Sequence, residues 1–352
     1  MLRPTGARPQ GDPKMQSLSR RRFTLGLAAA SLAATGGFAL SLRPGTRAVI
    51  VGGGPAGAEA ALSLRAAHPA ASVLLVERDP TRLARGEGGA GAPFLRPRAA
   101  AGLAALKASG VELVLDDVTG IDWSGGRLTL FSGRNLAFDR LLLAPGTAAR
   151  DEAIPGLDAA ARHAWPAAWG SEREARRLMA RLEALPERGH VVLRLPAGEA
   201  AHPAAAVSRA LALAGLVASR PGARLTVLDG TPDHRLARAF AAAVPARQRD
   251  RVAWIGADRG GLVRAVDARA GVLETDAGAI RADVVNFVPR LEAGAIARAA
   301  GLADDSGWCP CDDSGRSHLR AEATVLGDAR KEAQRTVAGA LQSARLATGA
   351  LA

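Results

Sequence analysis

The sequence contains no tyrosine, and aromatic residues make up only 3% of its 352 residues. Its two cysteines are too few for a disulfide framework. Only three of its 46 basic residues are lysine, and no basic run is interleaved with aromatic side chains, so nucleic acid is not an expected partner. After residue 44 no run of about 18 apolar residues occurs, so we expect a mature protein that is not transmembrane.

The first 44 residues have the composition of an export signal. They hold seven basic groups and one acidic group, and therefore half of the net charge of +12. Ser19-Arg-Arg-Arg-Phe23 precedes an uncharged stretch of small and apolar residues, Thr24–Leu42. This twin-arginine pattern predicts export of the folded protein to the periplasm, with cleavage near Ala39-Leu-Ser41. A disordered basic tail with a surface helix is the alternative.

A glycine-rich turn follows the first apolar strand. Ala48–Val51 has the pattern of a buried parallel strand, and Gly52, Gly54 and Gly57 then open an Ala/Leu-rich helix. In this G-x-G-x-x-G spacing the glycines permit a tight turn, close approach of a pyrophosphate, and close packing of helix on strand. The helix N-terminus would present free N–H groups to the phosphates. This turn is the strongest candidate for a cofactor site in the sequence.

An acidic residue follows the second apolar strand. Val73–Val76 ends in Glu77, twenty residues beyond Gly57, where a carboxylate accepts hydrogen bonds from the ribose of a dinucleotide. A glycine triplet alone is a weak signal, and a glycine-rich turn without a ligand is the alternative. Strand, turn, helix and carboxylate together predict a dinucleotide-binding domain.

Two later strand ends complete the candidate cofactor residues. One apolar strand ends in Ala144-Pro-Gly146, a form typical of the end of the first cofactor segment in two-dinucleotide-domain flavoproteins. Another ends in Gly327-Asp328 before a C-terminal helix. Asp328 would bond a hydroxyl of the ribityl chain or one near the pyrophosphate, and it would also serve as a helix cap. Before the first of these ends, alternating residues and Gly-rich turns over 118–139 predict a β-meander.

The middle of the chain repeats the α/β alternation without the glycine fingerprint. The strand His190–Leu195 is followed by the turn Pro196–Pro203, which has one glycine and two prolines, and by a helix to Ala218. Because glycines allow the backbone to approach phosphates, NAD(P)H is not expected to bind here. We expect an α/β protein with two Rossmann-like domains, divided as signal 1–44, FAD-binding domain 45–155 and 286–352, and an inserted second domain 156–285.

These features resemble the two-dinucleotide-domain flavoproteins, and more closely the flavoprotein subunit of flavocytochrome c sulfide dehydrogenase, a relative of sulfide:quinone oxidoreductases. The matching stretches are 118–122, 163–165, 282–286 and Ala299–Pro310, of which Gly307-Trp-Cys-Pro310 is the most specific. The resemblance implies FAD, a periplasmic location and a c-type cytochrome as electron acceptor. It also implies that sulfide or another reduced sulfur compound is oxidised at a cysteine pair beside the flavin.

The sequence departs from this family at the implied reaction centre. Cys309 matches one member of the redox pair, but the other falls at His202, which cannot form a disulfide. The cysteine that tethers the flavin falls near Arg85, so FAD is expected to be non-covalent. We also expect the C-terminal extension of the family to be missing, because the chain stops at Ala352. The leading hypothesis is an FAD-dependent oxidoreductase that passes electrons to cytochrome c; the alternative is a catalytically weakened, FAD-binding accessory or interaction subunit.

Each candidate reacting residue has a structural alternative. Cys309 is either a redox thiol facing the flavin or a part-buried structural thiol. His202 is either a base toward a thiol substrate or a surface histidine. A disulfide between Cys309 and Cys311 would strain its loop. These cysteines, with Asp312 and His318, match no standard zinc spacing, so no metal is expected.

Overall fold

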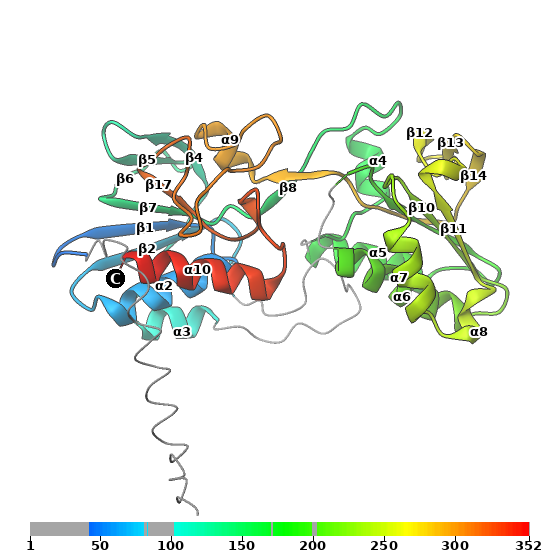
Figure 1. Ribbon diagram of the computed structural model, residues 1–352, viewed down its shortest axis with the longest axis horizontal. Coiled ribbons are helices and arrows are strands. Elements are labelled where there is room, and N and C mark those ends of the chain that lie inside the picture. The colour runs from blue at the N-terminus through cyan, green and yellow to red at the C-terminus, as the bar shows by residue number, and fades with distance from the viewer. Residues whose placement is uncertain (1–41, 81–82, 84–101, 170–171, 199–202, 352) are drawn as a thin grey trace, which may run out of the picture. The chain divides into compact units, whose positions relative to one another are not determined.

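The computed structural model describes residues 42–80, 83, 102–169, 172–198 and 203–351. Within them the chain forms two parallel sheets, each covered by helices on one face and by an antiparallel meander on the other (Figure 1). The predicted α/β class with two Rossmann-like halves is confirmed. Residues 1–41 of the predicted leader, Arg85 and His202 lie outside the described residues, so the predictions made for them stay predictions.

The first sheet has the strand order β17-β7-β1-β2-β3, and all its neighbours are parallel. Its strands are β1 (Arg47–Val51), β2 (Ser72–Glu77), β3 (Glu112–Leu115), β7 (Arg140–Leu143) and β17 (Ala323–Val325). In β1 the side chains of Ala48 and Ile50 enter one apolar cluster, and those of Val49 and Val51 enter another. Burial on both faces explains the continuous apolar run in the sequence.

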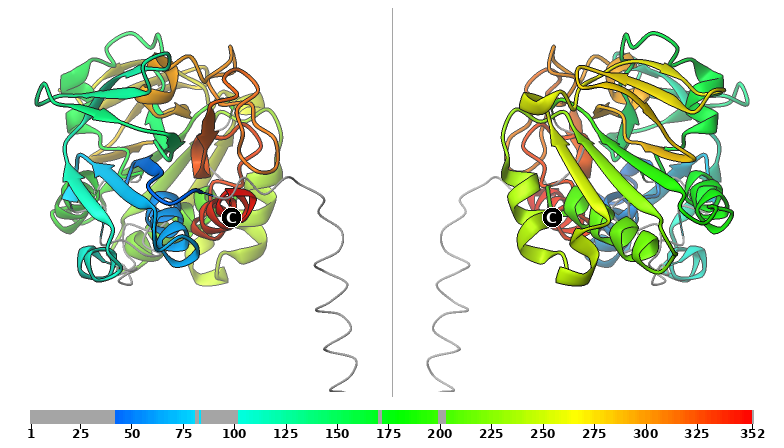
Figure 2. Two further views of the ribbon diagram at one scale, coloured as in Figure 1. Left: turned by 90° about the vertical axis from the view of Figure 1, so that its left-hand side faces the viewer. Right: turned by 90° about the vertical axis from the view of Figure 1, so that its right-hand side faces the viewer.

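Helices cover one face of this sheet, and the predicted meander covers the other. The helices are α2 (Pro55–Ala67), α3 (Leu103–Ala108) and α10 (Val337–Leu351). Helices α2 and α10 pack side by side and share the cluster that contains Leu64 and Ala344 (Figure 2). The other face carries β4 (Val118–Asp122), β5 (Arg127–Leu130), β6 (Asn135–Ala137) and α9 (Ala295–Ala299).

The second sheet has the strand order β11-β10-β9-β15, again all parallel. Its strands are β9 (His190–Leu195), β10 (Arg224–Asp229), β11 (Val252–Gly256) and β15 (Val284–Phe287). One face packs against α5 (Glu172–Glu183), α6 (Pro203–Ala218) and α7 (Arg235–Ala243), and α8 (Ala246–Arg249) packs on α6. The other packs against α4 (Ala159–Ala164), β12 (Val263–Asp267), β13 (Val272–Thr275) and β14 (Gly278–Arg281), with η2 (Ala257–Arg259) leading into β12.

The structure corrects the position at which the chain returns to the first domain. Strand β15 pairs with β9, with Val284 opposite Val191, so the predicted boundary at 285/286 cuts a strand of the second sheet. The return runs instead through β16 (Leu291–Ala293), which pairs antiparallel with β8 (Thr147–Ala149). An apolar run such as that of β15 suits a buried strand of either sheet, which is why its sequence could not assign it.

Candidate cofactor and redox site

The turn after β1 contains the three predicted glycines, and two of them leave no room for a side chain. A Cβ on Gly52, which has φ of +100°, would lie 2.2 Å from the carbonyl oxygen of Ala144. A Cβ on Gly57 would lie 1.8 Å from the carbonyl oxygen of Gly52. A Cβ on Gly54 would meet no heavy atom within 4 Å. Gly52 and Gly57 therefore let the helix pack on the sheet, whereas Gly54 keeps its backbone accessible.

Helix α2 begins at this turn without a side-chain cap. Its N-cap residue is Gly54, which makes no side-chain hydrogen bond, and Pro55 follows it. The first N–H groups of a helix have no intrahelical acceptor, and the helix dipole makes its N-terminus attractive to anions. The start of α2 is therefore suited to a pyrophosphate.

Glu77 supports the glycine turn. The residue is 4% exposed, and its Oε2 accepts a hydrogen bond from the N–H of Gly53 at 2.6 Å. Its Oε1 accepts one from the N–H of Asp79 at 2.7 Å. Each carboxylate oxygen can accept a second bond. Glu77 thus fixes the turn, a role that the sequence did not predict, and keeps acceptor capacity for a ribose.

The Gly327-Asp328 pair lies against the first turn of α2. It forms η3 (Gly327–Ala329), and a Cβ on Gly327 would lie 3.0 Å from the Cβ of Ala56. The N–H of Gly327 donates to the hydroxyl of Ser343 in α10 at 3.0 Å. Serine occurs in helices for many reasons, so no sequence signal pointed to Ser343. These contacts bring Asp328 to the glycine turn.

Asp328 carries an unsatisfied acceptor. Its Oδ1 is buried and has no hydrogen-bond partner in the part of the chain that the structure describes. Burial raises the pKa of Asp328 to about 6, opposed by the positive charge of Arg335. A buried polar atom without a partner is costly and is uncommon in folded proteins. The carboxylate is therefore suited to accept a hydrogen bond from a ligand.

Gly146 lies between β7 of the first sheet and β8, the strand that pairs with β16. It has φ of +63°, and its carbonyl accepts a hydrogen bond from the N–H of Gly294 at 3.0 Å. A Cβ on Gly146 would meet no atom within 4 Å, as at Gly54. With the start of α2 and the unsatisfied Asp328, these residues fit FAD, because its pyrophosphate needs N–H donors and its hydroxyls need acceptors.

Cys309 lies in the apolar core between the first sheet and its meander. The residue is 0% exposed. Its N–H donates to the carbonyl of Ala329 at 3.0 Å, and its carbonyl accepts from the N–H of Lys331 at 2.8 Å. The structure thus places Cys309 beside the segment that follows Asp328, as a buried thiol. Burial, with smaller effects of Cys311 and Asp304, raises the pKa of Cys309 to about 12.

Cys311 is half-buried, and its thiol donates to the carbonyl of Cys309 at 3.4 Å. Burial raises the pKa of Cys311 to about 11, although the charge of Arg330 opposes this effect. Both cysteines are free thiols. Because the thiolate is the nucleophilic form, neither thiol is activated at neutral pH in this structure.

At the carboxyl end of the second sheet, the carboxylate in the corresponding position is hydrogen-bonded by the chain itself. Asp229 ends β10, as Glu77 ends β2, and it is 1% exposed. Its Oδ1 accepts from the N–H and the hydroxyl of Thr231, at 3.0 and 2.7 Å. Its Oδ2 accepts from Nε1 of Trp254 at 3.0 Å. The chain itself therefore supplies the partners of this carboxylate.

Two kinds of feature are absent from the described residues. Among them, no group of three or more His, Cys, Asp and Glu side chains is arranged to hold a metal ion. None of their helices combines the length and the apolar character that a membrane crossing requires.

Two family models match adjoining parts of the chain. Residues 46–182 match the pyridine nucleotide-disulphide oxidoreductase family. Residues 175–289 match the central region of the flavoprotein chain of sulfide dehydrogenase (flavocytochrome c). The predicted cofactor, FAD, is confirmed by the first match, which covers the glycine turn and Glu77, and the assignment of individual residues to the FAD site stays a prediction. The predicted resemblance to the sulfide dehydrogenase flavoprotein is supported by the second.

Solved structures share the fold at low sequence identity. Reduced Bacillus anthracis CoADR-RHD aligns with a TM-score of 0.63 and 19% identity, over 86% of this chain and 56% of the other. The sulfide:quinone oxidoreductase of Aquifex aeolicus gives 0.60 and 17%, over 82% and 69%. The NAD-dependent persulfide reductase of A. fulgidus gives 0.65 and 18%, over 86% and 58%. The chain thus spans little more than half of the first and third proteins.

The fold, the glycine turn and the two matches agree with one another. The predicted class, an FAD-dependent oxidoreductase, is the class to which they point. Residues 46–182 are thus similar to the pyridine nucleotide-disulphide oxidoreductases, and residues 175–289 to the central region of the sulfide dehydrogenase flavoprotein chain.

Proposed function

We propose that this protein is an exported FAD-dependent oxidoreductase that takes electrons from sulfide or a related reduced sulfur compound and passes them to a c-type cytochrome. The observation that carries the proposal is the buried, unpartnered carboxylate of Asp328 beside the start of α2, in a chain whose residues 175–289 resemble the sulfide dehydrogenase flavoprotein. Export rests on the twin-arginine leader. The cytochrome partner rests on the resemblance alone.

The proposed FAD contacts divide between backbone and side chains. The N–H groups at Gly54 and the start of α2 bind the pyrophosphate. Asp328 accepts a hydrogen bond from a hydroxyl of the ribityl chain, which removes the cost of its unsatisfied oxygen. Glu77 holds the turn and accepts from the adenosine ribose. Bound FAD supplies an acceptor of two electrons that can release them one at a time.

The source of the electrons is argued from the two halves of the chain. The family model for pyridine nucleotide-disulphide oxidoreductases ends at residue 182, before β9. Asp229, at the ribose position of the second sheet, has three internal hydrogen bonds. Both observations favour a donor other than NAD(P)H, and the match of residues 175–289 favours sulfide.

The burial of Cys309 favours a second candidate function. A thiol with a pKa of about 12 is almost wholly protonated at neutral pH and is therefore a weak nucleophile. A homologue that binds FAD but has weakened catalysis, and acts as an accessory or interaction subunit, would tolerate such a residue. The two candidates differ in whether a sulfur compound reduces the bound flavin.

Anaerobic titration of the FAD-loaded protein with sulfide separates these candidates. We expect the flavin absorbance to bleach and to recover when oxidised cytochrome c is added. A flavin that stays oxidised at millimolar sulfide would remove the enzymatic proposal and leave the accessory one.

A matched pair of variants tests the role of Cys309 in the same titration. Cys309→Ala keeps a small apolar side chain in the core, so the fold should be retained. Under the enzymatic proposal Cys309 is the reacting thiol, so this variant should lose sulfide-driven bleaching by about 100-fold or more. Cys311→Ala should bleach like the parent protein. Equal bleaching rates for all three proteins would exclude Cys309 from the reaction.

The pH dependence gives a second reading of the same residue. Because burial raises the pKa of Cys309 to about 12, its thiolate fraction rises about tenfold per pH unit throughout the neutral range. A bleaching rate limited by this thiolate should increase steadily between about pH 7 and pH 10, after correction for sulfide ionisation. A plateau near pH 8 in this range would contradict thiolate attack by Cys309.

A further inference from the structure

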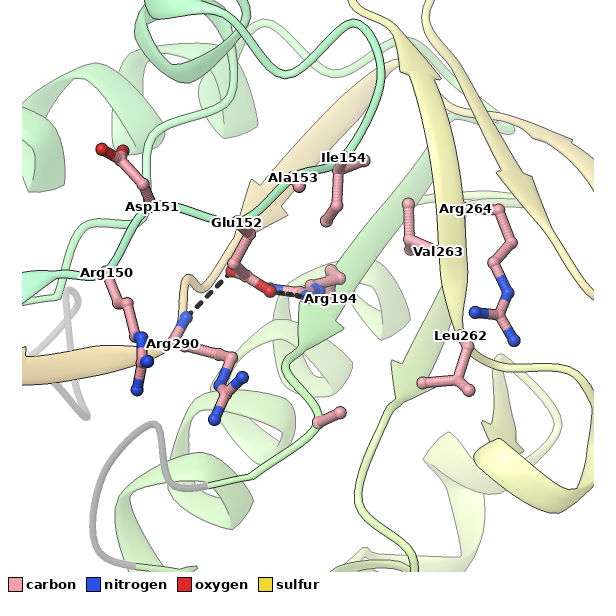
Figure 3. A pocket seen from close by; sticks show the side chains of 11 residues that line it. Arg150, Asp151, Glu152, Ala153, Ile154, Arg194, Leu262, Val263, Arg264 and Arg290 are labelled. Atoms are coloured by element: carbon pink, nitrogen blue, oxygen red, sulfur yellow. Dashed lines mark hydrogen bonds and ion pairs between the residues drawn. The ribbon is translucent and has the colours of Figure 1, made fainter. Parts of the chain in front are cut away.

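Arg150 and Arg290 lie between two neighbouring pockets, next to the paired strands β8 and β16. The larger pocket, of about 380 Å³, is lined by 11 residues from the carboxyl ends of β9 and β15, the start of β12 and the segment after β8 (Figure 3). Four of these residues are arginine. A second pocket of about 310 Å³ shares Arg150 and Arg290 with the first and also contains Ser306 and Trp308.

Arg150 and Arg290 are held directly opposite each other. They extend the antiparallel pairing of β8 and β16 by one residue, since Ala149 is paired with Leu291 and the N–H of Arg150 donates to the carbonyl of Arg290 at 2.8 Å. Figure 3 shows both guanidinium groups extending to the same side. Like charges directly opposite each other are destabilising unless a counter-charge is present.

The carboxylates beside the pair are already engaged. Glu152 accepts two hydrogen bonds from the Arg194 guanidinium, at 2.9 and 2.6 Å, and one from the N–H of Arg290 at 3.0 Å. Asp151 pairs with Arg162 at 2.9 Å and points away from the two arginines in Figure 3. The positive charge of Arg150 and Arg290 is therefore not neutralised by these neighbours.

The other charged groups that line the pockets add little to the net charge, because most of them are paired. In the larger pocket, Arg264 is bound by both oxygens of Asp276 at 2.7 Å. In the smaller pocket, Lys331 pairs with Asp304 at 2.8 Å. Glu332, which is exposed, is the one carboxylate among the residues that line the smaller pocket. The lining of the two pockets thus has an excess of positive charge at their shared wall.

Arg150 also connects these pockets with the segment that carries Cys309. Its Nη1 donates to the carbonyl of Ser306 at 3.4 Å. The same atom lies 3.8 Å from the position that a Cβ on Gly307 would take. Oε2 of Glu292 lies 3.4 Å from that position, but this carboxylate already pairs with Arg298 through Oε1 at 2.9 Å. A ligand bound by Arg150 would therefore lie near the Gly307-Trp-Cys309 segment.

We propose that Arg150 and Arg290 bind a small divalent anion of reduced sulfur, the size of thiosulfate or a short polysulfide. Two adjacent guanidinium groups offer planar, charge-assisted donors to a dianion, which also removes their mutual repulsion. The charge class of the ligand follows from the arginine pair. Its sulfur chemistry rests on the proposed function and on the approach of Arg150 to the Cys309 segment.

Calorimetric titration of the FAD-loaded protein with thiosulfate tests this site. We expect Arg150→Gln and Arg290→Gln each to weaken binding about tenfold or more, the effect of losing one charge-assisted contact. Two matched controls should bind within about twofold of the parent. Arg264→Gln removes an arginine of the same pocket that is paired with Asp276, and Arg269→Gln removes an exposed arginine outside it. Equal binding by all five proteins, or none by the parent, would overturn the proposal.

Thermal unfolding distinguishes a binding role from a structural one. Without anion, Arg290→Gln should unfold at the same temperature as the parent or higher, because one of two repelling charges is gone. With thiosulfate, the parent and Arg264→Gln should gain stability by mass action, and Arg290→Gln should not. If Arg150→Gln and Arg290→Gln both unfold at a lower temperature than the parent without anion, the two arginines stabilise the fold, and the proposal is contradicted.

Two comparisons separate this site from its alternatives. Arginine-dependent binding of ADP that is tighter than that of thiosulfate would replace the sulfur anion with a nucleotide phosphate. Thiosulfate binding without flavin bleaching by sulfide would keep the anion site and remove the proposed function. Bleaching by sulfide without thiosulfate binding would do the reverse.

Discussion

The two parallel sheets end in similar carboxylates that have opposite surroundings. At the edge of the first sheet, Asp328 has a buried oxygen without a partner in the described part of the chain, and Gly54 leaves the start of α2 accessible. At the edge of the second sheet, Asp229 is bonded by Thr231 and Trp254. Asp328, after β17, and Asp229, at the end of β10, thus differ in whether the chain itself supplies the hydrogen-bond partners of a buried carboxylate.

The largest expected effect comes from a substitution in the glycine turn at the carboxyl end of the first sheet. Gly57→Ala would place a Cβ 1.8 Å from the carbonyl oxygen of Gly52, so strand and helix must separate. We expect a loss of about 3 kcal/mol or more in the free energy of unfolding, at or beyond the upper end for overpacking, together with loss of FAD. Urea denaturation and the flavin content of the purified protein measure these two effects.

Gly54→Ala is the matched control at the same turn. Its Cβ would meet no atom within 4 Å, and its φ of −65° suits alanine, so stability should change by less than about 0.5 kcal/mol. FAD affinity should nevertheless fall, because the added methyl group obstructs the approach of the pyrophosphate. Unchanged FAD affinity in this variant would place the cofactor away from the turn.

The next effect is that of replacing Asp328, which should stabilise the protein without FAD but weaken the binding of FAD. Burial raises the pKa of Asp328 from 3.8 to about 6, so the folded chain without FAD binds more protons than the unfolded chain between about pH 4 and pH 6. The free energy of unfolding therefore falls as the pH rises through this range. Asp328→Asn should remove this pH dependence.

At pH 7 we expect FAD-free Asp328→Asn to be more stable than the parent by about 1–3 kcal/mol, and at pH 4 to be equal to it. The same variant should bind FAD about tenfold or more weakly, because an accepting carboxylate is lost. Denaturation at several pH values and FAD titration give both numbers. Lower stability of the variant at pH 7 would mean that Asp328 has a structural partner.

The sequence predicted the features that depend on residues close together in the chain. The order of apolar run, Gly52, Gly57 and Ala/Leu-rich helix specifies β1 and α2, and the alternation over 118–139 specifies the meander. The burial of Cys309 could not be predicted, because it depends on how the segment packs between the first sheet and the meander. The pairing of Arg150 with Arg290 also escaped, because these residues are 140 positions apart and meet only through β8 and β16.

At the carboxyl end of the second sheet we expect an effect on stability alone. Asp229→Ala removes the acceptor for Thr231 and Trp254, and we expect it to lower the free energy of unfolding by about 1–3 kcal/mol. Because this carboxylate serves the fold, FAD content and sulfide bleaching should be unchanged. A loss of either activity without a loss of stability would show that the second edge has a ligand of its own.

The most direct test of the contrast between the two edges is the stoichiometry of dinucleotide binding. Equilibrium titration of the cofactor-free protein with FAD, and then of the FAD-loaded protein with NADH, measures both edges in one preparation. The account predicts one FAD per chain and no NADH binding tighter than about 1 mM. Micromolar NADH binding, or a failure to bind FAD, would contradict it.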